Sequence, residues 1–182
     1  MSIEQLSMKD WQRLRNLRIR SIADSPDAFG SSLEEVHQRS RAQWQADLVE
    51  MATFVATRDG HDVGLARGFL HALEPDAWLR SMWVAPEYRG HHIGEALSKC
   101  VIDWAIAQGC SRLLLDVADR NVHAIALYER LGFIATGETD RYPPPRAHIR
   151  EHRRARLLER LTWSTSAGSM AHAKDKAPTE RE

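Results

Sequence analysis

A short stretch in the middle of the chain has the residue types that bind an anion through the backbone. A predicted strand at 77–85 is followed by Pro-Glu-Tyr and then by RGHHIGEAL, which begins a predicted helix. The first N–H groups of a helix have no partner within the helix, and the helix dipole favours negative charge beside them. Gly90 and Gly94 allow a close approach of the backbone, and Arg89 adds a positive charge. The turn therefore predicts a phosphate site at the start of the helix.

Two stretches of the chain resemble a known family. MWVAPEYRGHHIGEAL resembles the acyl-CoA-binding signature of the GNAT N-acetyltransferases, which is Arg or Gln, two residues, Gly, any residue, and then Gly or Ala. His92 departs from it, because the family usually has Gly there; the residues that fit are Arg89, Gly90, His91, Ile93 and Gly94. NVHAIALYERLGF at 121–133 is similar to the second conserved stretch of the family. It follows in the family's order, with a predicted strand between.

The resemblance implies an α/β fold with a mixed, twisted sheet flanked by helices, in which two splayed parallel strands form the cleft for acetyl-CoA. It implies that the turn holds the diphosphate of the coenzyme; the turn residues are Arg89, Gly90, His91, His92, Ile93, Gly94 and Glu95. In the family the preceding strand binds pantetheine through its backbone, which here places Met82 and Val84 along the coenzyme. An N–H near Val84 faces the acetyl oxygen. Asn121 bonds the pantetheine arm, or caps its helix, or both.

Acetyl transfer from a thioester to an amine expels a thiolate and needs a neutral amine. Tyr128 lies where the family places a phenol that donates to this thiolate, and a phenol pKa of about 10 suits donation to a thiolate of pKa about 8.5. The other interpretation of Tyr128 is a core aromatic. Asp116 aligns with a Glu that acts as a base in some members, and its shorter side chain needs a relaying water. The alternative for Asp116 is a solvated or salt-bridged strand carboxylate.

The function that the resemblance implies is direct acetyl transfer from acetyl-CoA to a primary amine, expected to belong to a small molecule. One alternative is a protein N-terminal or lysine acetyltransferase. Another is a non-catalytic acyl-CoA-binding regulatory module, which His92 keeps open because its side chain either crowds the turn or contacts phosphate. A narrow, closed acceptor pocket favours a small amine, whereas an open groove favours a peptide.

The elements that must position these residues follow from hydrophobic periodicity and turn signals. Asp59-Gly60 predicts a tight hairpin. Helices are predicted at 9–24, 33–50, 93–108 and 121–131, and strands at 3–6, 52–58, 62–73, 77–85, 112–118 and from 133 onward. This order predicts one mixed α/β domain over residues 1–163. The segment 164–182 lacks periodicity and large apolar residues, and is predicted to be a disordered tail.

The composition argues against several other classes of protein. The 182 residues include 25 Lys+Arg and 25 Asp+Glu, and this balance disfavours nucleic-acid binding through bulk charge. Two cysteines, no long apolar run and no signal core predict a cytoplasmic protein without membrane contact. HIREH at 148–152 has a zinc-protease spacing, but on a strand its two histidines are about 13 Å apart, so no metal is expected. Pairing through edge strands leaves a homodimer open.

Overall fold

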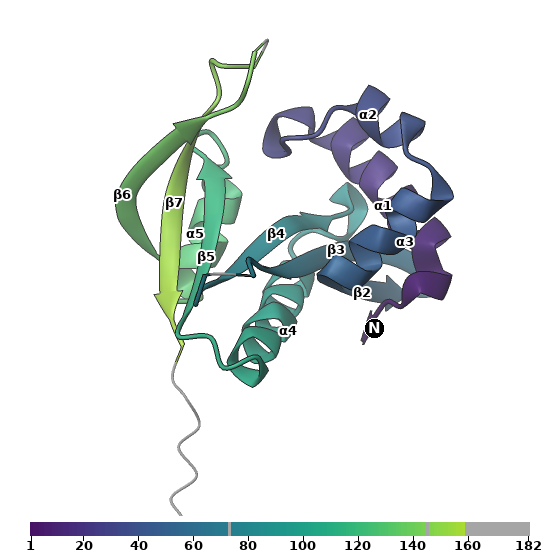
Figure 1. Cartoon of the computed structure of the whole chain (residues 1–182), viewed down its shortest axis with the longest axis horizontal. Helices are drawn as coiled ribbons and strands as arrows, with labels where there is room; N and C mark the ends of the chain where they lie inside the picture. The colour runs from purple at the N-terminus through teal and green to yellow at the C-terminus, as the bar shows by residue number, and fades with distance from the viewer. Residues whose placement is uncertain (73, 145, 159–182) are drawn as a thin grey trace, which may run out of the picture.

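Across the residues that the structure describes, seven strands form one sheet with helices on both faces (Figure 1). The computed structural model describes residues 1–72, 74–144 and 146–158, so the predicted tail at 164–182 lies outside the described residues. The spatial order of the strands is β1–β2–β3–β4–β5–β7–β6. In chain order the strands are β1 Ser2–Gln5, β2 Met51–Arg58, β3 His61–Leu70, β4 Ala77–Val84, β5 Arg112–Ala118, β6 Ile134–Arg141 and β7 Arg150–Leu157.

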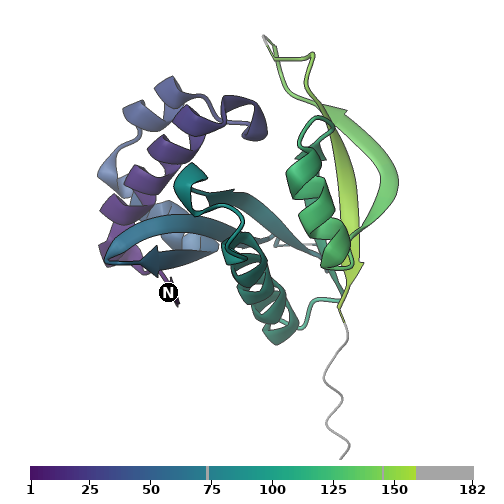
Figure 2. The same ribbon diagram turned by 180° about the vertical axis from the view of Figure 1, so that it is seen from behind.

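The helices divide between the two faces of the sheet. They are α1 Trp11–Asp24, α2 Leu33–Gln38, α3 Arg41–Glu50, α4 Ile93–Ala107 and α5 Val122–Arg130, with short 3-10 turns at Met8–Asp10, Pro26–Ala28 and Pro86–Tyr88. Figure 2 shows α4 and α5 on the face opposite α1 to α3. The predicted α/β fold is confirmed, and so are the predicted helices at 9–24, 93–108 and 121–131, to within a few residues. No helix in the described ranges is long and apolar enough to cross a bilayer.

The prediction of one helix over 33–50 was wrong, because the segment forms α2 and α3 with a break between them. Arg39 has an extended backbone, and Ser40 is the N-cap of α3. The Ser40 hydroxyl accepts a hydrogen bond from the Gln43 N–H at 3.3 Å, and the Gln43 side chain accepts one from the Ser40 N–H at 2.8 Å. This reciprocal cap starts a new helix in the middle of an otherwise continuous apolar pattern.

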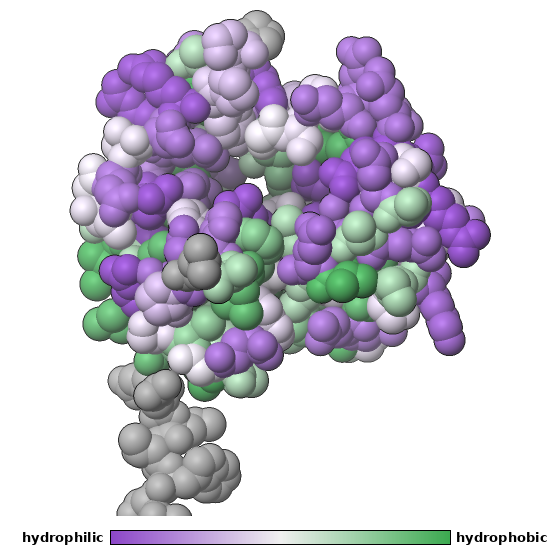
Figure 3. Space-filling view, viewed as in Figure 1, coloured by the Kyte–Doolittle hydropathy of each residue, from purple (hydrophilic) through white to green (hydrophobic). Residues whose placement is uncertain are grey.

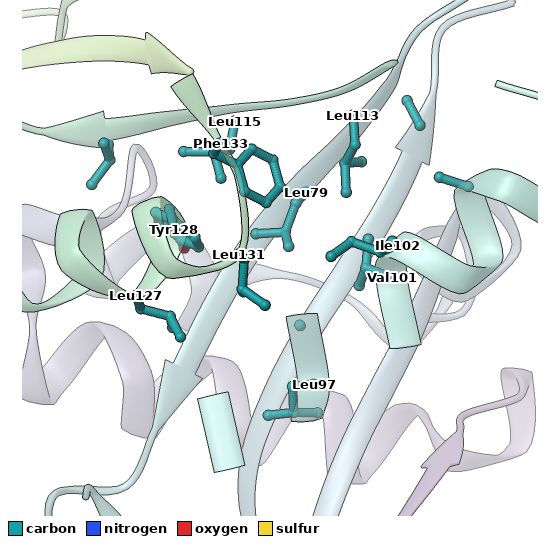
Figure 4. Close-up of a cluster of buried hydrophobic side chains, with 14 of the residues drawn as sticks. Leu79, Leu97, Val101, Ile102, Leu113, Leu115, Leu127, Tyr128, Leu131 and Phe133 are labelled. Atoms are coloured by element: carbon teal, nitrogen blue, oxygen red, sulfur yellow. The ribbon is translucent and has the colours of Figure 1, made fainter. Parts of the chain in front are cut away.

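Two buried clusters hold the helices against the sheet. On one face, Leu97 and Val101 of α4 and Leu127 of α5 pack with Leu113 and Leu115 of β5 (Figure 4). The cluster on the other face joins α1 and α3 to β2 and β3, and its members include Leu14, Leu17, Trp44, Val55 and Leu65. Apolar burial on both faces fixes the sheet between two layers of helices.

The parallel neighbours β4 and β5 pair at only two positions before they separate. The paired residues are Ala77 with Leu113 and Trp78 with Leu114. β4 continues to Val84 and β5 continues to Ala118 without further pairing to each other. The predicted splay of two parallel strands is thereby confirmed, and α4 and α5 begin at the open end of this splay because each follows one of the two strands.

We expect Gly68→Ala to lower the free energy of unfolding by about 1–3 kcal/mol, because overpacking a well-filled core is costly. A methyl carbon at Gly68 of β3 would lie 2.4 Å from the Trp104 ring of α4. Gly30→Ala is the matched control, since its added carbon meets nothing within 4 Å. Urea denaturation of both variants measures the effect. Equal stabilities would contradict the close approach of α4 to β3.

Candidate active site

The turn between β4 and α4 presents a row of unpaired backbone N–H groups. The Arg89 N–H donates to the Pro86 carbonyl at 3.2 Å, and the Ala96 N–H donates to the His92 carbonyl at 3.0 Å. Between these two, no N–H of residues 90–95 donates to another group in the described part of the chain. The last three of them belong to the first turn of α4. Such a row at a helix N-terminus attracts an anion.

Two residues of this turn have a left-handed backbone. Gly90 has a φ of 81°, and His92 has a φ of 58°. Gly adopts this conformation freely, whereas a residue with a Cβ pays about 1–2 kcal/mol. The His92 side chain is 85% exposed, with Nδ1 3.5 Å from the Glu95 carboxylate. Hydrogen bonds from Lys99 and then from His92 lower the pKa of Glu95. His92 therefore strains the turn while its ring lies largely in solvent.

The Arg89 side chain is engaged by the protein itself. Its guanidinium pairs with Asp24 at the end of α1, and its Nε donates to the Val84 carbonyl at 3.0 Å. The Trp83 indole donates to the same Asp24 carboxylate at 2.9 Å. In this structure Arg89 fastens the turn to α1, so the backbone N–H groups are the free donors of the turn.

β4 offers a free edge to the same site. Ser81 has a left-handed φ of 55°, and an extra residue of β4 opposes β3 there, which makes a bulge. Met82 and Val84 lie beyond the bulge, are half-buried, and line the cavity described below. A Cβ at Gly94 would lie 3.6 Å from Cε of Met82, so the start of α4 packs closely on this strand. Alternate backbone groups of β4 face the splay with β5 and are open to a ligand.

α5 places two polar side chains on the opposite wall. Asn121 is the N-cap of α5, where its Oδ1 accepts from the Ala124 N–H at 3.2 Å. Tyr128 is 6% exposed, and its ring meets Phe133 edge-on with 5.7 Å between centroids (Figure 4). Burial raises the pKa of the Tyr128 phenol, which therefore stays protonated at neutral pH. Both residues also line the cavity. Asn121 is thus a helix cap at the cavity wall, and Tyr128 is a core aromatic at the cavity wall.

Carboxylates of β5, β6 and β7 border the cavity together. Asp116 is paired with Arg153, whose Nε lies 3.0 Å from Oδ1. Burial raises the pKa of Glu151, and the negative charges of Asp116 and Asp140 raise it further, against a hydrogen bond from Tyr142. Asp116 was predicted from the sequence as a site residue, whereas Glu151 was not. Among the described residues, no three His, Cys, Asp or Glu side chains are placed together to hold a metal ion.

Of the site residues predicted from the sequence, all but His91 line one cavity of about 850 Å³, and Figure 3 shows the surface hollowed between the β6–β7 side and the α1–α2 side. The cavity also reaches α1, α3 and β3, where sequence analysis singled out no site residue. Arg18 is one of the residues that line it there. A signal was present, because Arg18 stands four residues from both Leu14 and Ile22, on the apolar stripe of α1.

One arginine joins the two sides of this hollow. Arg146, from the connection between β6 and β7, donates to the carbonyls of Pro26 at 3.0 Å and Phe29 at 2.7 Å, and also to that of Gly30. Phe29 and Gly30 line the cavity, as do Tyr142 and Pro143 beside Arg146. The β6–β7 connection is therefore tied to the loop before α2 at this side of the cavity.

Comparisons with known proteins agree with this geometry. The model of the acetyltransferase (GNAT) family matches residues 11–133. A thialysine N-epsilon-acetyltransferase of Bos taurus is 46% identical over 55 residues, which are 30% of this chain and 32% of that protein. A spermine/spermidine N(1)-acetyltransferase of Bacillus subtilis (strain 168) is 36% identical over 64 residues, which are 35% of this chain and 42% of that protein. The matches thus span less than half the length of these curated relatives.

The fold has solved counterparts. The crystal structure of an acetyltransferase of the GNAT family from Streptococcus pneumoniae matches with a TM-score of 0.74 and 20% sequence identity. The match covers 87% of this chain and 99% of that chain. At this identity the likeness establishes the fold, including the sheet and the helices that border the cavity.

We expect His92→Gly to be more stable than His91→Gly by about 1 kcal/mol, because of the two only residue 92 has a left-handed backbone. Both variants lose the same side chain and add the same freedom to the unfolded chain, so each is the control for the other. Urea denaturation measures the difference. Coenzyme affinity should stay near the wild-type value in both, since neither change removes an N–H. A less stable His92→Gly would contradict the strain at this position.

Proposed function

The chain belongs to the acetyltransferase (GNAT) family, and from this membership and the geometry of the cavity we propose that it transfers an acetyl group from acetyl-CoA to the primary amine of a small molecule. The observation that carries the proposal is the row of unpaired N–H groups at 90–95, beside the splay of β4 and β5. A diphosphate at that row directs the rest of the coenzyme along the free edge of β4. The thioester then lies between Val84 and Tyr128, which line the cavity from β4 and α5.

The coenzyme is held mainly by backbone in this proposal. Gly90, His91, His92, Ile93, Gly94 and Glu95 contribute N–H groups to the diphosphate, and Met82 and Val84 contribute strand groups to pantetheine. Asn121 keeps its capping bond and lines the path of the pantetheine arm. Arg89 contributes by holding the turn against Asp24. Side-chain identity then matters little at the turn, which is why a His at position 92 is compatible with coenzyme binding.

A small acceptor is supported by the hydrogen bonds that cross one side of the cavity. Arg146 bonds across to the carbonyls of Pro26, Phe29 and Gly30, and a peptide lying through this side of the cavity would have to break these bonds. The two curated relatives are named for thialysine and for spermine or spermidine. These observations favour a small amine over a protein acceptor.

In the proposed reaction the amine nitrogen attacks the thioester carbon, the C–N bond forms, and the C–S bond then breaks to release the thiolate of CoA. The N–H near Val84 stabilises the oxyanion of the tetrahedral intermediate, which is worth about 3 kcal/mol in comparable sites. Tyr128 donates a hydrogen bond to the leaving sulfur, and its raised pKa keeps the proton on the phenol while the thiolate leaves. Holding both substrates in one cavity supplies the remaining rate enhancement through orientation.

Two carboxylates compete for the proton that the amine must lose. Asp116, the residue expected from the sequence, is engaged by Arg153 on both oxygens, at 3.0 and 3.4 Å. Glu151 has a raised pKa, caused first by burial, and a base whose pKa lies closer to neutral matches the task better. We therefore propose that Glu151 accepts the proton. Asp116 helps to raise the pKa of Glu151, because its negative charge is one cause of the raised value.

We expect Tyr128→Phe to lower kcat by about 100-fold, since loss of a positioned acid typically costs 10²–10⁴-fold. Acetyl-CoA affinity should be nearly unchanged, because the row of N–H groups at 90–95 stays intact. Release of CoA thiol over a panel of amines measures turnover, and calorimetry measures binding. Tyr88→Phe removes a phenolic hydroxyl from another part of the cavity lining, in the turn before Arg89, and serves as the control. Unchanged turnover in Tyr128→Phe would remove this residue from the mechanism, and no binding of acetyl-CoA to the wild type would refute the proposed function.

The pH dependence separates the two carboxylates. The same amine acceptor is used throughout. Glu151→Gln should lower kcat/KM by about 100-fold and abolish the acid limb, which is the fall of kcat/KM at low pH caused by protonation of Glu151. Asp116→Asn removes a like charge beside Glu151, so the pKa of Glu151 falls and the acid limb moves to lower pH, while the rate above the limb is retained. An acid limb that disappears in Asp116→Asn and persists in Glu151→Gln would make Asp116 the base.

A further inference from the structure

The part of the cavity beside α1, α3 and β3 has an excess of positive charge. Its charged residues are Arg18 on α1, Arg39 before α3, Arg67 on β3 and Asp47 on α3, here called the arginine pocket. Among the residues that line this part of the cavity, three guanidinium groups face one carboxylate, and the charge of Glu50, which is not part of this lining, acts on Arg67. None of these four residues belongs to the proposed coenzyme site.

Asp47 neutralises two of the three arginines only in part. Its Oδ1 lies 2.5 Å from Nη2 of Arg39, and its Oδ2 lies 3.5 Å from Nη2 of Arg67. Arg67 is 4% exposed and also donates to the Thr53 hydroxyl at 3.2 Å and to the Asp47 carbonyl at 3.1 Å. These bonds fix Asp47 and Arg67 in place and leave no carboxylate for Arg18.

Arg18 is a buried charge without an acceptor in the described part of the chain. It is 6% exposed, its Nη1 is enclosed without a hydrogen-bond partner, and its guanidinium lies 4.9 Å from the centre of the Phe29 ring. Burial, and then the charge of Arg67, lower the pKa of Arg18 to about 10, so it stays charged at neutral pH. An unpaired buried charge is strongly destabilising. A leucine would suit this position on the apolar stripe of α1, so the arginine points to a ligand.

Other donors around the cavity have the same deficit. Nε of Arg39, Nε1 of Trp44 and Nε1 of Trp78 are enclosed and have no partner within the described residues. All three residues line the cavity together with Arg18. All four atoms are donors. A ligand in the arginine pocket that supplies oxygen acceptors and negative charge would pair with Arg18, whereas an uncharged alkyl amine would not.

We propose that the arginine pocket binds a carboxylate of the acceptor, so that the substrates are amines that also carry a carboxylate. This inference rests on the proposed function, because it names the substrate class of the same site. The guanidinium of Arg18 lies over the Phe29 ring, and that of Arg39 lies over the Trp44 ring at 4.8 Å, so an aromatic ring supports each of them. A guanidinium pairs with a planar carboxylate through two N–H groups on one edge. The amine would then point toward Asp116 and Glu151, so both charges of the acceptor meet opposite charges.

The test compares acceptors that differ in the carboxylate alone. Acetylation of ω-amino acids from glycine to 6-aminohexanoate is measured against alkylamines of matched length at saturating acetyl-CoA. One chain length of amino acid should exceed its alkylamine by about tenfold or more in kcat/KM, as hydrogen bonds to charged groups allow. Arg18→Met should abolish this preference, and Arg18→Lys should retain part of it. Arg15→Met, on the same helix and away from the cavity, should keep it.

A second readout needs no catalysis. The preferred ω-amino acid should raise the Tm of the wild-type protein in the presence of CoA, and this rise should vanish in Arg18→Met. Without ligand, Arg18→Met should have a Tm equal to or above that of the wild type, because it removes an unpaired buried charge. A purely structural arginine predicts the opposite, a lower Tm, and that result would overturn the inference.

The outcomes separate this inference from the proposed function. Turnover of alkylamines as fast as amino acids of every length would overturn the carboxylate pocket and leave the acetyltransferase proposal standing. A preference for 2-aminoethylphosphonate over every ω-amino acid would also overturn it, in favour of a tetrahedral anion. Coenzyme binding without turnover of any amine would refute the proposed function. In that case a Tm rise with the amino acid that is present in the wild type and absent in Arg18→Met still supports the carboxylate pocket. If the wild type shows no Tm rise, the carboxylate pocket is overturned.

Discussion

The separation of β4 from β5 after two paired positions is the constraint on which the site depends. Continued pairing would satisfy the edge of β4 with β5 and leave no cavity between them. Because the strands are parallel, the helices that follow them begin at the same end of the sheet. The N-terminus of α4 and the capped start of α5 therefore border one opening. The left-handed Ser81 adds a bulge that turns β4 further from a regular strand, and Met82 and Val84 lie beyond it.

The sequence predicted the turns and helix starts, because the conformation of neighbouring residues determines them. The turn at 89–95 is set by glycines and a helix start, and Asp59-Gly60 forms its hairpin because both residues have positive φ. The environment of a side chain is decided by distant partners instead. Asp116 meets Arg153, 37 residues away, and Arg67 meets Asp47, 20 residues away. No periodicity reveals such pairs, so the sequence placed Asp116 at the site without showing that an arginine holds it, and it missed Glu151.

Three kinds of polar group line different parts of the cavity. Backbone N–H groups at 90–95 offer partial positive charge that no substitution removes, which suits the invariant phosphates of a coenzyme. Carboxylates, Asp116 and Glu151 among them, line the cavity from β5 and β7, where the proposed reaction takes a proton from the amine. The arginine pocket brings full positive charges on side chains, which a substitution can remove. A shared coenzyme site on backbone and a variable acceptor site on side chains fit a family whose members are named for different amines.

Unfavourable local energies concentrate around this cavity. His92 and Ser81 carry left-handed backbones, and Arg18 carries a buried charge without a partner in the described residues. Each is a cost of about 1–3 kcal/mol that the two apolar clusters must offset. Such costs are compatible with a stable fold only if they are few, and their placement is informative because a ligand can relieve some of them. A bound anion would pair Arg18, whereas no ligand relieves His92, whose strain lies in the backbone. The two costs therefore differ in kind: the cost at Arg18 can be removed by a ligand, whereas the cost at His92 cannot.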